Sequence, residues 1–212
     1  MNRNEKFVIT INRELGSGGR TIGEKLAQQL QVPFFDKALI QSLEKEYQLT
    51  ADEIEHLKGQ QHNWWADFKR SLKIMPSYMA PQYIADPVSM PDFLITDDIF
   101  KTETEILKGI AEDGSCVIAG RSAFYIFRNH PNHLNILIQA SADYRIAHLV
   151  KKRGITLDEA QSIIRQVDEG RESYINKYTK TSRYDTRNYN LVVSMDDISE
   201  ADAISMIMNY IH

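Results

Sequence analysis

Apolar residues recur along the chain in two alternating patterns, which predict short buried strands and longer amphipathic helices. Five short apolar runs predict strands: the run around residues 7–11, Val32–Phe35, Ser115–Ala119, His133–Gln139 and Asn190–Met195. Segments with helical spacing separate these runs. Because strands that alternate with helices favour a parallel, doubly wound sheet, we expect an α/β fold with a five-stranded parallel sheet flanked by helices.

The helices are predicted from apolar residues three or four positions apart and from capping signals. The first helix is expected to begin at or near Thr21, with Ile22 and Leu26 on its apolar face. The segment Thr156–Glu159 is a predicted capping box at the start of a long later helix. Further helices are predicted over Lys37–Tyr47, from Thr50, over Asp97–Glu112, from Asp143 and near the end of the chain.

The helical periodicity fails between Gly59 and Pro91, a stretch that contains both tryptophans and four of the six prolines. We interpret residues 59–95 as an inserted, mostly helical subdomain with broken helices and loops, within a single domain that spans residues 1–212. Apolar residues of this insert make a homodimer a possible assembly: Trp64, Trp65, Met75 and Met79.

The segment after the first strand has the composition of a phosphate-binding loop. Gly16, Gly18 and Gly19 fall within four positions, directly before the predicted helix at Thr21. Glycines let backbone N–H groups approach an anion, and the positive end of the helix dipole favours negative charge there. The common pattern GxxxxGK[ST] is altered, because Arg20 stands where that pattern has its lysine.

Charge and cysteine content narrow the class of protein. The formal net charge of −4 argues against a surface made for nucleic acid, but residues 145–187 contain ten Lys/Arg against six Asp/Glu. This local excess favours a small anionic ligand, the alternative being a solvated helix face. The single cysteine, Cys116, lies in an apolar run and predicts a buried thiol. No apolar run approaches the ~18 residues of a membrane span, and we expect a cytoplasmic protein.

These motifs resemble those of the nucleoside monophosphate kinases, and more narrowly the cytidylate kinase-like family. The resemblance rests on INRELGSGGRTIG followed by VPFFDKALI, and then on AGRS, IQASADYR and DEGRESY in the same order. It implies a P-loop NTPase fold, ATP and Mg²⁺ as cofactors, and phosphoryl transfer to a small acceptor such as CMP. It also implies that the insert lies on the acceptor side and that residues 154–187 form a basic lid.

The resemblance assigns the glycine loop to the nucleotide, with two possible registers. The family pattern GxxGxGKGT places Gly19 at its lysine, whereas the general pattern places Arg20 there. In both registers Thr21 falls at the helix start, where the resemblance makes it a Mg²⁺ ligand, directly or through water. The nucleotide-binding candidates are Gly16, Ser17, Gly18, Gly19, Arg20 and Thr21.

Candidates for the acceptor and for the chemistry follow from the same resemblance. Arg121 comes after a strand, where the family holds a monophosphate; capping the next element is the alternative. Asp36 and Lys37 end the second strand, on the acceptor side, although Asp36 has an ordinary helix cap as an alternative. Arg171 is the expected lid cation, unless it forms a surface salt bridge. The expected catalytic residues are therefore Arg20, Arg121 and Arg171.

Two other functions are compatible with the sequence. The altered loop would also suit a nucleotide-binding sensor that has lost transfer, and the unusual insert would suit a kinase for a different small metabolite. In each case the expected partner is a small molecule, with neither nucleic acid nor membrane. Either Arg20 or a cation of the lid is expected to take over the role of the missing lysine.

Overall fold

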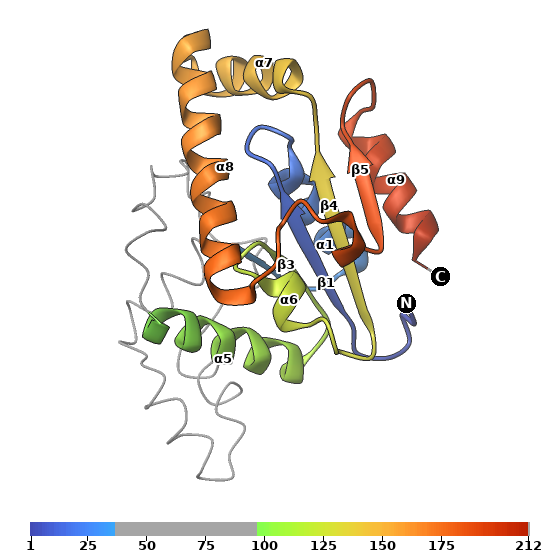
Figure 1. Ribbon diagram of the computed structural model, residues 1–212. Helices are drawn as coiled ribbons and strands as arrows, with labels where there is room; N and C mark the ends of the chain where they lie inside the picture. The colour runs from blue at the N-terminus through green and yellow to red at the C-terminus, as the bar shows by residue number, and fades with distance from the viewer. Residues whose placement is uncertain (37–96, 212) are drawn as a thin grey trace.

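The computed structural model describes residues 1–36 and 97–211, and within them one parallel sheet forms the centre of the molecule (Figure 1). The strand order is β2-β3-β1-β4-β5, with every neighbouring pair parallel. The strands are β1 (Val8–Arg13), β2 (Phe34–Asp36), β3 (Cys116–Ala119), β4 (His133–Gln139) and β5 (Leu191–Ser194). The predicted five-stranded parallel α/β sheet is therefore confirmed.

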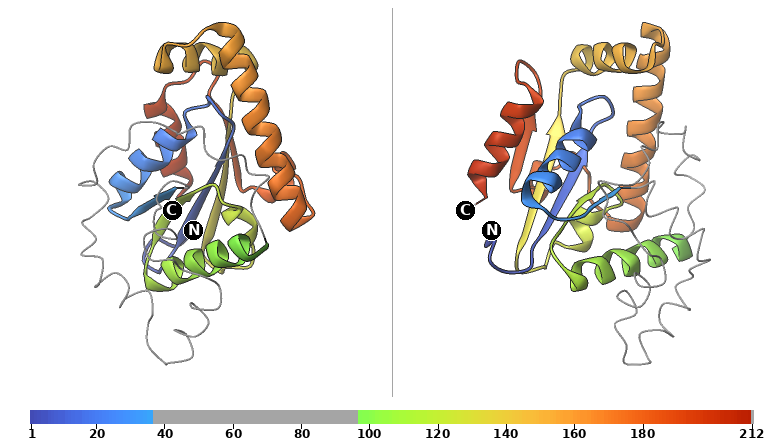
Figure 2. Two further views of the ribbon diagram at one scale, coloured as in Figure 1. Left: turned by 90° about the vertical axis from the view of Figure 1, so that its left-hand side faces the viewer. Right: turned by 180° about the vertical axis from the view of Figure 1, so that it is seen from behind.

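Helices cover both faces of this sheet (Figure 2). Apolar side chains of α1 and α9 pack with Ile9 and Ile11 on one face, and those of α5 and α6 pack with Val8 and Ile118 on the other. Alternate residues of β1 thus enter opposite cores, as the period of a strand requires. The helices are α1 (Gly19–Leu30), α5 (Asp97–Asp113), α6 (Ala123–Ile126), α7 (Ala142–Arg153), α8 (Leu157–Thr179) and α9 (Glu200–Tyr210), with a 3₁₀ turn η3 at Thr186–Asn188.

The parallel arrangement brings the ends of four strands to one edge of the sheet. Ile11 pairs with Ala119, which also pairs with Asp36, and Arg13 pairs with Ile138. The carboxyl ends of β1, β2, β3 and β4 consequently lie side by side. Ligands of open α/β sheets bind at this carboxyl edge.

Most predicted boundaries agree with the structure to within two residues. β4 spans His133–Gln139 as predicted, and Thr156 opens α8 with the predicted capping box. The first helix begins at Gly19 rather than at Thr21, because Gly18 already serves as its N-cap with a positive φ of 80°. The helices predicted over 37–47 and from residue 50, and the insert at 59–95, lie outside the described residues.

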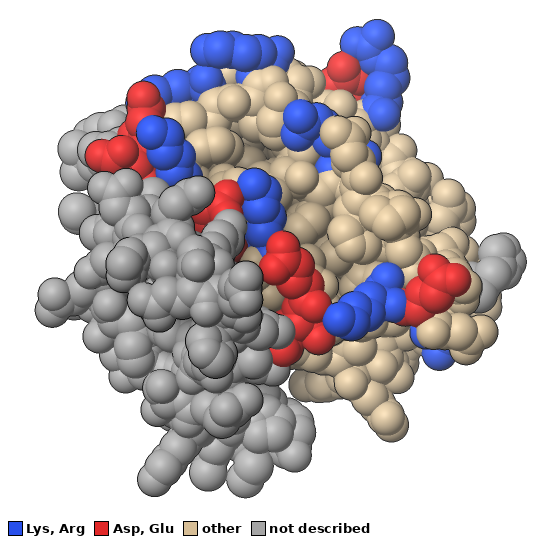
Figure 3. Space-filling view, turned by 90° about the horizontal axis from the view of Figure 1, so that it is seen from below, with Lys and Arg blue, Asp and Glu red and all other residues tan. Residues whose placement is uncertain are grey.

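The single cysteine behaves as the sequence predicts. Cys116 is fully buried, and burial raises the pKa of its thiol to about 12. Within the described ranges, the helices are too short or too polar to cross a membrane. On the face seen from below in Figure 3, the basic and acidic side chains of the described residues lie interspersed.

Candidate functional site

The glycine-rich loop is braced from within and from the neighbouring strand. The N–H of Glu14 donates to the carbonyl of Ile138 on β4 at 3.1 Å. Ser17 is fully buried, and both its hydroxyl (2.9 Å) and its N–H (3.3 Å) donate to the Glu14 carbonyl. Gly16 and Gly18 have positive φ values of 88° and 80°, which only glycine adopts without strain. The loop therefore holds a fixed backbone curve at the end of the central strand.

The loop leads directly into the first turn of α1, whose positive end is not neutralised by the helix itself. Gly18 is the N-cap and provides no side-chain cap, and no acidic residue lies in the first turn. The amides of Gly19 and Thr21 belong to this turn, which has no preceding helical carbonyls to bond. A helix N-terminus of this kind favours an anion such as phosphate.

Helix α7 packs against the outer side of the loop. A Cβ at Gly16 would lie 2.7 Å from the Arg145 carbonyl oxygen, so a side chain there would clash with the helix backbone. His148 hydrogen-bonds to the Gly16 backbone. Burial, aided by the positive charge of Lys152, lowers the pKa of His148. The imidazole is therefore biased toward its neutral form beside the loop.

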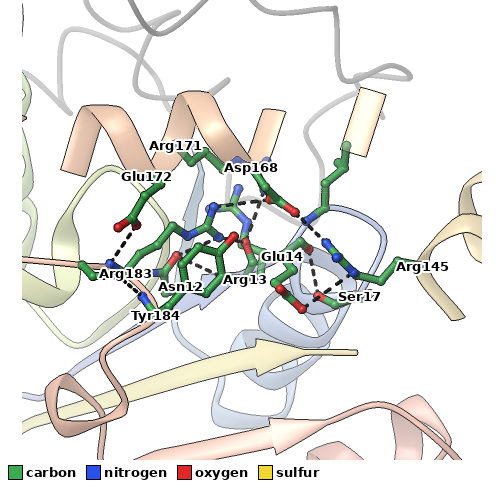
Figure 4. A network of polar contacts seen from close by, with 12 residues as sticks. Asn12, Arg13, Glu14, Ser17, Arg145, Asp168, Arg171, Glu172, Arg183 and Tyr184 are labelled. Atoms are coloured by element: carbon green, nitrogen blue, oxygen red, sulfur yellow. Dashed lines mark hydrogen bonds and ion pairs between the residues drawn. The ribbon is translucent and has the colours of Figure 1, made fainter. Parts of the chain in front are cut away.

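Asp168 of α8 links the glycine-rich loop to helices α7 and α8 (Figure 4). One of its carboxylate oxygens, Oδ1, accepts the N–H of Leu15 at 3.1 Å, and the other, Oδ2, pairs with Arg145 at 2.6 Å. Oδ1 also lies 3.3 Å from the fully buried Arg183 and 3.6 Å from Arg171. This carboxylate thus lies within ion-pair distance of three guanidinium groups beside the loop, one of which, that of Arg145, also pairs with Glu14 at 3.7 Å.

The backbone of Arg13 is the second meeting point of these arginines. Its carbonyl oxygen accepts from Arg171 Nη1 at 3.3 Å and from Arg183 Nη2. Arg183 also contacts Asn12 Oδ1 at 3.4 Å. The end of β1 is therefore enclosed by cations from α8 and from the segment that follows it. Arg171, the predicted lid cation, lies directly beside the loop.

Three arginines line a small cavity between the ends of β1 and β3. Arg13, Arg121 and Arg171 all border this space, which has a volume of about 50 Å³. Its described lining also includes Gly120, Ser122 and apolar side chains of α6 and α8, with neither Asp nor Glu among them. A cavity with this lining suits an anionic group.

The segment after β3 has an unusual backbone. Gly120, Arg121 and Ser122 have consecutive positive φ values of 84°, 58° and 55°. Non-glycine residues seldom occupy this region, and each such residue costs about 1–3 kcal/mol. The conformation is held by the Gly120 N–H, which donates to the Ile11 carbonyl at 3.0 Å. Strained backbone of this kind concentrates at binding and catalytic sites.

The side chain of Arg121 is directed into the interior. It forms an ion pair with Glu103 of α5, and both side chains are almost completely buried. Glu103 also accepts the hydroxyl of Tyr174 at 3.0 Å. The predicted phosphate ligand is therefore held by a carboxylate that the sequence reasoning did not identify. Arg121 also borders the cavity, and its role in holding a phosphate stays a prediction.

Arg20 and Asp36, predicted for the nucleotide and the acceptor respectively, contact each other. Arg20 Nε donates to Asp36 Oδ2 at 2.7 Å, and Arg20 Nη1 lies 3.4 Å from Glu24. The guanidinium of Arg20 is thus oriented toward the end of β2. Thr21 lies in the first turn of α1, partly exposed. Lys37 lies outside the described residues.

A larger hollow borders the same site along α7 and α8. Its volume is about 890 Å³, and its lining includes Arg145, Arg165, Asp168 and Tyr184. Binding sites for small molecules typically have volumes of about 300–1,000 Å³. The hollow is therefore large enough for a nucleoside.

A comparison with known protein families identifies the family to which the chain belongs. The sequence matches the cytidylate kinase-like family over residues 8–197, which is nearly its whole length. The chain belongs to the cytidylate kinase-like family. A comparison with curated proteins gave no match.

Solved structures agree with the P-loop kinase fold of this cytidylate kinase-like chain. An uncharacterized protein from Eubacterium ventriosum is similar, with 22% identity, a TM-score of 0.68 and coverage of 97% of this chain and 98% of the other. A shikimate kinase from Bacteroides thetaiotaomicron has 17% identity and a TM-score of 0.50, with coverage of 97% and 98%. At these identities the similarity establishes the fold.

Several residues of this family member's site were missed by sequence reasoning. Glu103 and Asp168 hold the predicted arginines, and Arg13 borders the arginine-lined cavity. His148 contacts the loop from a helix that is distant in sequence. Arg13 alone had a usable signal, since it is the last strand residue before the glycines. The other three depend on how helices pack against the loop.

Proposed function

We propose that this protein is an ATP-dependent phosphotransferase that phosphorylates a small acceptor, with CMP or another nucleoside monophosphate as the first choice. The observation that carries the proposal is the glycine loop at the carboxyl end of the central strand, which leads into an uncapped helix N-terminus. Membership of a kinase-like family supports the same reaction class.

The ATP phosphates would bind to Gly16–Thr21. Gly16 and Gly18 are already in the left-handed conformation that a tight anion-binding loop requires. Ser17 is committed to bracing the loop through Glu14, so its part in binding would be to hold the curve rather than to contact phosphate through its side chain. The hollow beside α7 and α8 offers space for the nucleoside portion.

Thr21 is our candidate Mg²⁺ ligand. Within residues 1–36 and 97–211, acidic, His and Cys side chains do not gather in threes as a protein-made metal site. Mg²⁺ commonly keeps several waters and binds through phosphate oxygens with one or two protein ligands. A single hydroxyl at the start of α1 fits that mode, and the ion would neutralise charge on the transferred group.

The acceptor would lie at the cavity lined by Arg13, Arg121 and Arg171. Arg121 would hold an acceptor phosphate, and Arg171 would face the charge that develops on the transferred group. Asp36, paired with Arg20, and Lys37 would orient the acceptor from the β2 side. Phosphoryl transfer depends mainly on such positioning and charge stabilisation, because little covalent chemistry falls to the protein.

The acceptor and the turnover are the parts of the proposal to be tested first. A coupled ADP-release assay with ATP and Mg²⁺ should be run against nucleoside monophosphates, with shikimate as a metabolite acceptor. We expect ADP release to depend on one acceptor class and on Mg²⁺. If ATP binds but no acceptor stimulates ADP release, the protein is a nucleotide-binding sensor; faster release with a metabolite than with any nucleotide would make it a metabolite kinase.

A further inference from the structure

The family register of the loop places Gly19 at the position of the P-loop lysine, and the structure explains why no lysine stands there. A Cβ at Gly19 would lie 2.6 Å from Arg13 Cβ, 3.2 Å from Arg13 Cγ and 3.1 Å from Ile138 Cβ. These distances are well inside ordinary carbon–carbon contact of about 3.5–4.0 Å. Any side chain at position 19 would therefore collide with the stem of Arg13.

The backbone of Gly19 does not itself require glycine. Gly19 is the first residue of α1, and its φ is not among the positive values of this chain, unlike that of Gly18. Glycine lowers helix stability relative to alanine. The clearest physical reason for glycine at this position is the space that Arg13 occupies.

The far end of Arg13 explains a second glycine. A Cβ at Gly120 would lie 3.2 Å from Arg13 Cζ and would overlap Nη1. Arg13 therefore runs from the first residue of α1 to the segment that follows β3. Its guanidinium borders the cavity that Arg121 and Arg171 also line. This position lies between the loop proposed for ATP and the residues proposed for the acceptor.

We propose that Arg13, at the end of β1, supplies the positive charge that the lysine supplies in other P-loop kinases. The proposal rests on the proposed function and names the residue that would contact the transferred phosphoryl group. A guanidinium binds two phosphate oxygens with a rigid planar fork, whereas a lysine ammonium binds phosphate as a point charge. Arg20, the sequence-based candidate for this role, is oriented instead toward Asp36.

The first test removes charge and keeps the bulk of the stem. Arg13→Met should lower kcat/KM for ATP about 100-fold, the usual effect of removing one group that stabilises transition-state charge. It should also abolish the thermal shift produced by ATP with Mg²⁺. Arg20→Met should lower kcat/KM for ATP by less than about a tenth of the factor expected for Arg13→Met. Arg128 is exposed, and the control variant Arg128→Met should behave as wild type.

The second test exchanges the two positions and reads folding as well as binding. Gly19→Ala should lower the melting temperature of the free protein, and it should do so less in an Arg13→Gly background, because Arg13 Cβ is the nearest clashing atom and alanine would keep it. Gly19→Lys in the Arg13→Gly background should restore ATP-dependent thermal stabilisation that Arg13→Gly alone loses. This pattern of results is expected if the Arg13 side chain occupies the space, and supplies the charge, of a lysine at position 19.

The outcomes separate this inference from the proposed function. If wild type binds ATP and turns over, but Arg13→Met does so equally well or Arg20→Met is the more damaging, the inference is wrong and the function stands. Equal destabilisation by Gly19→Ala with and without Arg13 would overturn the steric part. A wild-type chain that shows no thermal shift with ATP and Mg²⁺ would overturn the proposed function, and the inference with it.

Discussion

The N–H of Leu15, inside the glycine-rich loop, donates to the carboxylate of Asp168 on α8 across 3.1 Å. The two residues are separated by most of the chain, and their bond links the proposed nucleotide loop to the helix that carries Arg171. Because Asp168 also pairs with Arg145 and Arg183, any movement of α8 would change the charge balance beside the loop. The position of α8 and the order of the loop are therefore coupled.

Asp168→Asn should destabilise the protein by about 3 kcal/mol, because it removes the negative charge that faces the fully buried guanidinium of Arg183. The amide can still accept the Leu15 N–H, so the loss reports charge rather than the hydrogen bond. Denaturant unfolding measures it. Asp97→Asn, at an exposed pair with Lys177, is the control and should cost about 0.5 kcal/mol or less. A loss at Asp168 no larger than at Asp97 would contradict this coupling.

Glu103→Gln should also cost about 3 kcal/mol, since it leaves Arg121 buried beside a neutral partner. Inorganic phosphate should restore part of the lost melting temperature by binding at the arginine-lined cavity. Sodium chloride at the same ionic strength is the control for general salt effects. Equal responses to the two salts would argue against an anion site at Arg121.

Alanine substitutions at two helical glycines should change the stability of the protein in opposite directions. A Cβ at Gly23 would meet Phe34 Cε2 at 2.9 Å and Ile11 Cδ1 at 3.0 Å, whereas at Gly170 nothing lies within 4 Å. We expect Gly23→Ala to destabilise by about 1–2 kcal/mol through overpacking. Gly170→Ala should stabilise by about 0.5–1 kcal/mol through helix propensity. Melting temperatures that move in the same direction would contradict this packing of α1 on the sheet.

Acid should weaken the fold through His133. Burial lowers the pKa of His133 from 6.5 to about 4. Between these two pH values the unfolded chain binds a proton at this residue and the folded chain does not. The free energy of unfolding should therefore fall as the pH drops, by about 1.5 kcal/mol between pH 6.5 and about pH 5 from this residue. His133→Gln should show a correspondingly shallower pH dependence in denaturant unfolding. Identical slopes in the two proteins would refute the assignment.

The fold could be predicted because its signals are local. β4 is an unbroken apolar run, and the capping box at Thr156 is contained in four residues. The glycine loop was found in the same way, although its helix begins at Gly19 because Gly18 takes the cap. Periodicity and capping signals lie within short segments of sequence, and tertiary packing did not change the strands and helices that these segments predict.

The site could be predicted only in part, because its contacts join distant segments. Arg121 and Arg171 were identified from local motifs, but their carboxylate partners depend on the placement of α5 and α8. The sequence also directs attention to Arg20, which follows the glycines directly. Only the three-dimensional arrangement reveals that Arg13 fills the space above Gly19. Side-chain direction at a strand end cannot be obtained from spacing alone.

Transfer of the terminal phosphate of radiolabelled ATP to an acceptor, with purified wild-type protein and Mg²⁺, is the most direct test of the account. We predict one labelled acceptor product, formed in equal amount to ADP, with CMP as the first acceptor to be tried. Tight binding of ATP with no labelled product from any nucleotide or metabolite acceptor would contradict a phosphotransferase.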